Sequence, residues 1–124
     1  MPRFAILEHT GAPDDPTGRH YDLLLEHGAA CRTWRLASLP ERGGPAVAAV
    51  ELPPHRLAWL DHEAGDISGG RGFARRVATG VYSLSAGDLA EEGMSGDLVI
   101  GGVIAGRRLR LAASSGGWVA VVDG

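Results

Sequence analysis

Short runs with the apolar and polar alternation of β-strands recur along this chain, and glycine or proline turns separate them. The runs follow the roughly 8–12-residue spacing of small all-β domains, and almost no segment has helical periodicity. Nineteen glycines among 124 residues, about twice the ordinary frequency, suit tight turns and a curved sheet. Because closure removes exposed sheet edges, the pattern predicts an all-β fold: a small closed or nearly closed antiparallel β-barrel of about eight strands, with at most one or two short helical turns.

The expected elements form a single domain that spans residues 1–124. Pro53 and Pro54 are expected to end the fourth strand, and residues 55–60 to form one turn or a short extended segment. The acidic residues 61–66 are expected to form an exposed loop, and residues 85–93 to hold one helical turn. The expected strands are residues 3–9, 19–26, 31–37, 46–52, 73–82 (as one strand, or as two that break at Gly80), 98–104, 107–113 and 118–122.

The basic residues narrow the function classes. All twelve are arginine, and the absence of lysine excludes a Walker A loop, a Schiff-base lysine and lysine-dependent nucleotidyl transfer. A net charge of −3 argues against a general nucleic-acid coat, which is usually strongly basic. It permits a local arginine patch that holds one phosphate.

The chain contains no targeting or spanning signal. No apolar run approaches the ~20 residues of a membrane span, and the first residues do not have the pattern of a signal peptide. The single cysteine, Cys31, excludes an intramolecular disulfide and a CxxC metal knuckle. We therefore expect a cytoplasmic monomer that has no membrane partner.

The strand expected at residues 19–26 carries the most distinctive chemistry. Because successive side chains of a strand point to opposite faces, His20 and Asp22 share one face. A neutral imidazole and a carboxylate at this spacing suit a divalent metal, and they equally suit a structural hydrogen bond. A barrel can bring His9, at the end of the first expected strand, beside them. Two imidazoles and one carboxylate would then form an open facial site with positions for water and a substrate oxygen.

The run from Phe4 to His9, the block from His20 to Glu26, and the pair Thr33–Trp34 resemble the phosphoesterase domain of bacterial DNA ligase D. A later block at residues 55–65 and the ending at residues 97–122 follow in the order of that family. The resemblance covers nearly the whole chain, and the His-Tyr-Asp-Leu block is its most specific part.

The resemblance implies a closed β-barrel that trims DNA 3′ ends with manganese, or with another divalent transition metal. It implies that the enzyme removes a 3′-phosphate or a 3′-terminal ribonucleoside from DNA or RNA–DNA ends, alongside a separate DNA ligase or polymerase. The metal ligands would be His9, His20 and Asp22, which are thereby catalytic together with His55. His55 would contact the scissile phosphate and serve as general acid.

Several departures from the family keep other functions open. The family's strand arginine is Leu24 here, its lysine after the tryptophan strand corresponds to Ser38, and its N-terminal leader has no counterpart before the first expected strand. Arg56 or Arg71 would have to supply the phosphate-binding charge, or both are solvated surface residues. The alternative is a non-catalytic metal- or nucleic-acid-binding β-barrel relative. A third possibility is a structural or protein-binding barrel in which the histidine and aspartate of the strand are a buried hydrogen-bonded pair.

Overall fold

The fold is almost entirely β. The computed structural model describes residues 2–41, 43–84, 97–100, 107–114 and 117–122. Within these residues it has nine strands and one short 3₁₀ helix. They are β1 (Arg3–Thr10), β2 (Arg19–His27), β3 (Ala30–Leu36), β4 (Val47–His55), η1 (Leu57–Asp61), β5 (Ala64–Asp66), β6 (Phe73–Leu84), β7 (Asp97–Ile100), β8 (Arg107–Ser114) and β9 (Gly117–Val122).

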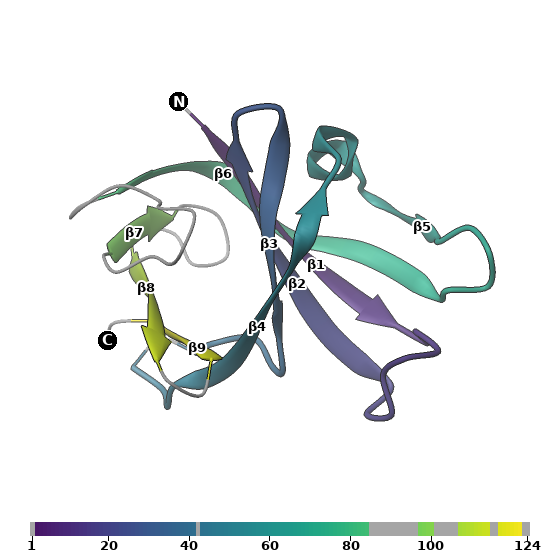
Figure 1. Cartoon of the computed structure of the whole chain (residues 1–124), viewed down its shortest axis with the longest axis horizontal. Coiled ribbons are helices and arrows are strands. Elements are labelled where there is room, and N and C mark those ends of the chain that lie inside the picture. The colour runs from purple at the N-terminus through teal and green to yellow at the C-terminus, as the bar shows by residue number, and fades with distance from the viewer. Residues whose placement is uncertain (1, 42, 85–96, 101–106, 115–116, 123–124) are drawn as a thin grey trace.

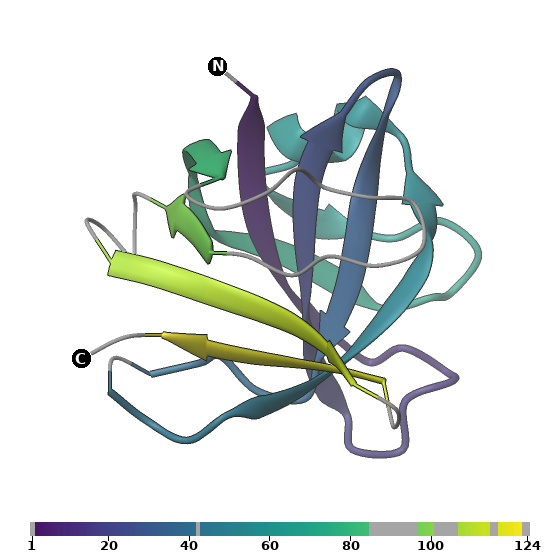
Figure 2. The same cartoon turned by 60° about the vertical axis from the view of Figure 1, so that its left-hand side comes forward.

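All the strands pair antiparallel in one sheet, with the order β1-β2-β3-β4-β9-β8-β7-β6-β5 (Figure 1). In addition, β1 pairs with β6, so that β1 has a hydrogen-bonded neighbour on each edge. Strands β8 and β9 lie on one side of β1–β3, whereas η1 and β5 lie on the other (Figures 1 and 2). The prediction of an all-β, antiparallel fold is confirmed. No helix among the described residues is long and apolar enough to cross a membrane.

Two apolar clusters use the two faces of the first three strands. Successive side chains of a strand point to opposite faces. Each of β1, β2 and β3 therefore contributes residues to both clusters, one cluster on each face of the sheet. The larger cluster is centred on Phe4, Ile6, Leu23, Leu25, Trp34 and Leu36. The smaller one lies on the opposite face under η1 and consists of Ala5, Leu7, Leu24, Cys31 and Leu60. His9 on β1 and His20 and Asp22 on β2 lie on the same face as the smaller cluster, beyond its edge.

Several expected boundaries were wrong. Strand β4 continues through both prolines to His55, because the pairing of β3 with β4 is irregular between Cys31 and Thr33. Proline lacks a backbone N–H, and it is tolerated in a strand where the ladder is interrupted. The acidic segment, expected as an exposed loop, contains β5, which pairs with β6. The segment after β4 forms η1, which agrees with the turn that was one of the two expectations for it.

Strand β6 runs unbroken past Gly80, where a Cβ would lie 3.0 Å from the Phe4 ring. Glycine at this position therefore allows the backbone of β6 to approach the core of the sheet, and the strand does not break there. The helical turn expected at residues 85–93 lies outside the described residues. So do residues 101–104 of the strand expected at residues 98–104.

Candidate metal centre

Three potential ligands meet where β1 and β2 lie side by side. His9 and His20 are direct partners in the antiparallel register, and Asp22 follows His20 on the same face. One ligand atom from each residue lies within 4.8 Å of the other two. His20 and Asp22 are buried, with 2% and 7% of their surface exposed, and His9 is half-buried. The structure thus brings together the three residues that the sequence suggested.

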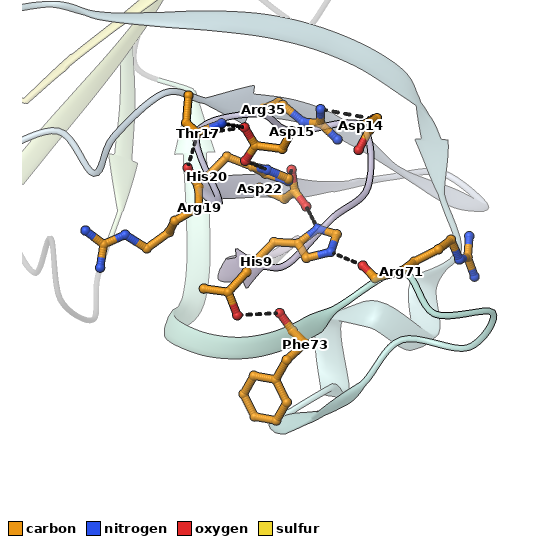
Figure 3. Close-up of polar contacts among 11 residues, drawn as sticks. His9, Asp14, Asp15, Thr17, Arg19, His20, Asp22, Arg35, Arg71 and Phe73 are labelled. Carbon is orange, nitrogen blue, oxygen red and sulfur yellow. Dashed lines mark hydrogen bonds and ion pairs between the residues drawn. The ribbon is translucent and has the colours of Figure 1, made fainter.

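A carboxylate from the loop between β1 and β2 orients His20. Its Nδ1 lies 2.8 Å from Asp15 Oδ2, so Nδ1–H donates to the carboxylate (Figure 3). In the neutral ring, Nε2 then carries the lone pair, and it lies 3.5 Å from Asp22 Oδ1. Both of these atoms are buried and have no hydrogen-bond partner. Two facing buried acceptors are unfavourable unless a proton or a cation lies between them.

His9 is oriented in the same way from the other side. Its Nε2 lies 2.8 Å from the carbonyl oxygen of Arg71, which can only accept, so Nε2–H is the donor (Figure 3). The other ring nitrogen, Nδ1, lies 3.7 Å from Asp22 Oδ2. Hydrogen bonds from the outer ring nitrogens therefore turn one lone pair of each imidazole toward the same carboxylate, as is usual for metal-binding histidines.

The donor set fits a divalent transition metal. Two imidazole nitrogens and one carboxylate suit manganese, iron or zinc, and three protein ligands leave positions open for water or a substrate oxygen. Ligand atoms that bind one ion at ~2.1 Å lie ~3–4 Å apart. The separations from His9 Nδ1 to Asp22 Oδ2 and from His20 Nε2 to Asp22 Oδ1 fall in this range, and one ligand atom from each of the three residues lies within 4.8 Å of the others.

The same contacts set the protonation of His20 and Asp15. Burial alone would lower the pKa of His20, but the neighbouring carboxylates of Asp22 and Asp15 outweigh burial and raise the pKa above 6.5. Asp15 accepts from Thr17 and from His20, and these bonds lower the pKa of its carboxyl group from 3.8 to about 2.

We expect an NMR titration of the metal-free protein to give His20 a pKa above 6.5 and the variant Asp15→Asn to lower it. A raised folded-state pKa stabilises the fold below pH 6.5, and this contribution is lost as the pH rises through the folded-state value. For Asp15 the sign is opposite: its contribution is present above pH 3.8 and is lost as the pH falls toward about 2. An unchanged His20 pKa in Asp15→Asn would contradict the assigned hydrogen bond.

The contact between Arg71 and His9 depends on a glycine. Gly72 has φ +95°, and a Cβ there would collide with the carbonyl oxygen of Thr10. Any larger residue must push the loop before β6 away from the end of β1. The Arg71 carbonyl, one residue earlier, then moves away from His9 Nε2.

The variant Gly72→Ala should therefore weaken metal binding by ~10–100-fold, the usual effect of losing a partner of a ligand. It should also lower the free energy of unfolding by more than ~1 kcal/mol, because alanine is strained at positive φ. Calorimetric titration with Mn²⁺ and chemical denaturation measure the two effects. The matched control is Gly70→Ala, since Gly70 has φ +68° but open space around its Cβ position. Equal loss of metal affinity in both variants would refute the steric explanation.

A cavity of about 690 Å³ is lined by two of the three candidate ligands, His9 and Asp22. His55 lines it from the end of β4, and its Nδ1–H donates to the Pro53 carbonyl at 3.0 Å. This bond leaves Nε2 of His55 as the nitrogen that can exchange a proton with a ligand. His55 therefore lines the same cavity as His9 and Asp22.

The two arginines proposed from the sequence also line this cavity. Arg56 is exposed. The Arg71 guanidinium donates to the Ser68 carbonyl and hydroxyl within its own loop, at 2.8 and 3.2 Å, and points away from His9 (Figure 3). Neither guanidinium contacts the three candidate ligands.

Sequence reasoning missed two residues, Asp15 and Arg35. Asp15 lies in a segment with two glycines and two prolines and was treated only as loop. Arg35 follows the core residue Trp34 on β3, and its alternation relative to that tryptophan was the available signal. No family model matches the chain, and no curated protein matches it.

Proposed function

We propose that the protein is a metal-dependent phosphoesterase that acts on DNA 3′ ends, removing a 3′-phosphate or a 3′-terminal ribonucleoside. The observation that carries the proposal is the convergence of His9 Nδ1, His20 Nε2 and the Asp22 carboxylate beside a cavity that His55 also lines. The same three residues and His55 carry the resemblance to the phosphoesterase domain of DNA ligase D. Mn²⁺ is the metal that this resemblance favours.

Each residue has a definite task in the proposed reaction. When bound, the ion supplies charge for the phosphoryl oxygens and a bound water of lowered pKa. His20 and His9 hold the ligand atoms in place through their bonds to Asp15 and the Arg71 carbonyl. His55, as an imidazolium whose Nδ1–H donates to the Pro53 carbonyl, gives the proton on Nε2 to the leaving oxygen and ends the step as the neutral ring.

The expected architecture accompanies this proposal. β1 is the first strand in the sheet order and also pairs with β6, the second strand from the other end, and this pairing supports a small, nearly closed barrel. The single cysteine suits a cytoplasmic place of action. We further propose a monomer that works with a separate DNA ligase or polymerase.

One observation favours the second candidate, a non-catalytic metal- or DNA-end-binding relative. Leu24, where the family has an arginine, is fully buried in the smaller apolar cluster with Leu7 and Leu60. That position cannot present a cation to a phosphate.

Incubation with Mn²⁺ and a DNA primer that ends in a 3′-phosphate or in one ribonucleotide separates the two candidates. The phosphoesterase should convert the end to a 3′-hydroxyl, and both EDTA and the variant His20→Ala should stop the conversion. Mn²⁺ binding without any conversion would leave only the binding protein. Conversion that persists in His20→Ala would assign the activity to a contaminant.

A further inference from the structure

Arg35 lies beside the three candidate ligands, one strand away. It is the direct partner of Asp22 in the register of β2 and β3, so the two side chains share a face. Both residues line the same cavity, together with His55. The Arg35 side chain is 27% exposed. It lines the cavity from β3, whose preceding residue, Trp34, packs in the larger apolar cluster.

The guanidinium of Arg35 is only partly satisfied. Its Nε is buried and has no hydrogen-bond partner. Its Nη1 lies 3.3 Å from Oδ2 of Asp14, whose side chain is 69% exposed (Figure 3). An ion pair with such an exposed carboxylate contributes little and is easily exchanged. The Arg35 guanidinium thus has one weakly bound carboxylate and one N–H donor without a partner. Such a group can exchange the carboxylate for an acceptor that binds more strongly with two oxygens.

We propose that Arg35 is the phosphate-binding residue of the site and that Asp14 occupies its guanidinium until a terminal phosphate replaces the carboxylate. This inference rests on the proposed function and deepens it, because it assigns the cation that Leu24 does not supply. The planar fork of Arg35 can donate two parallel hydrogen bonds to phosphate oxygens, as a single ammonium cannot.

The other cavity arginines are weaker candidates. The Arg71 guanidinium already donates twice to Ser68 and points away from His9. Arg56 is exposed, and it precedes η1 rather than lying on the strand face that carries Asp22. Only Arg35 among the three is a cross-strand partner of a candidate ligand.

The loop between β1 and β2 contacts both Arg35 and one of the candidate ligands. Two adjacent carboxylates of this loop have separate tasks: Asp15 holds His20, and Asp14 holds Arg35. Displacement of Asp14 by phosphate therefore leaves the Asp15–His20 bond in place. Phosphate and metal binding should respond to different substitutions in the same loop.

The test is calorimetric titration of the Mn²⁺-loaded protein with inorganic phosphate. In Arg35→Ala, phosphate affinity should fall ~10–100-fold, the usual effect of losing hydrogen bonds from a charged group. Arg35→Lys should lie between that variant and the wild type. Asp14→Asn should bind phosphate ~2–5-fold more tightly, because a surface competitor is removed. The matched control is Arg19→Ala, which removes an equally charged but more exposed side chain outside this cavity.

Mn²⁺ affinity of each variant keeps the test decisive. Arg35→Ala should bind Mn²⁺ as tightly as the wild type or more tightly, whereas a disrupted fold would weaken it. If the wild type binds Mn²⁺ and phosphate but Arg35→Ala and Arg19→Ala bind phosphate alike, the assignment of Arg35 is overturned and the phosphoesterase proposal stands. If the wild type neither binds phosphate nor cleaves the 3′-phosphate primer, both proposals fail.

Discussion

Replacing His20 with alanine should reduce the affinity for Mn²⁺ by more than ~100-fold, beyond the ~10–100-fold typical of losing a ligand's hydrogen-bond partner. His20 is the most buried of the three candidate ligand residues, and Asp15 fixes its orientation. Without it, two ligands remain, too few for a stable site in competition with water. Calorimetry or electron paramagnetic resonance of free Mn²⁺ measures the loss.

Two further variants guard this prediction against unfolding. Asp22→Asn keeps the shape of the side chain but removes its charge, and it should also lose most of the affinity for Mn²⁺. His27→Ala, at the exposed end of the same strand, should bind Mn²⁺ as the wild type does. Near-equal affinities of wild type, His20→Ala and Asp22→Asn would show that the ion binds elsewhere.

Replacing His55 with alanine should lower kcat on a 3′-phosphate primer by ~10²–10⁴, the usual contribution of a general acid. Mn²⁺ affinity should stay unchanged, because His55 is not among the three clustered ligands. Single-turnover measurement at saturating Mn²⁺ isolates this chemical step.

The leaving group provides the control for His55. A p-nitrophenolate group leaves without a proton, so p-nitrophenyl phosphate should be hydrolysed by His55→Ala nearly as well as by the wild type. An equal loss on both substrates would indicate that His55 binds or positions the phosphate. An unchanged kcat on the primer would remove His55 from the reaction.

Much of the fold and the centre of the site could be predicted from local pattern. Alternation placed His20 and Asp22 on one face, and the antiparallel pairing of β1 with β2 then placed His9 opposite His20. These contacts need only strand periodicity and one register. The short strand β5 and the passage of β4 through two prolines depend on pairing with distant residues, which local propensity does not reveal.

The surroundings of the site were not predictable for the same reason. Asp14 and Asp15 lie in a loop whose own sequence favours only turns, and their partners are on β3 and β2. Leu24 shares the strand face of His20 and Asp22, but η1 covers that part of the sheet and buries the leucine. Whether a face is solvated depends on what packs over it, and that is a tertiary property.

A crystal soaked in Mn²⁺ tests most directly whether His9, His20 and Asp22 form a metal centre. Anomalous diffraction at the manganese edge should show one strong peak ~2 Å from His9 Nδ1, His20 Nε2 and an Asp22 carboxylate oxygen. The bonds from His20 to Asp15 and from His9 to the Arg71 carbonyl should remain. An empty site, or a peak bound by other residues while these three stay unliganded, would contradict the account.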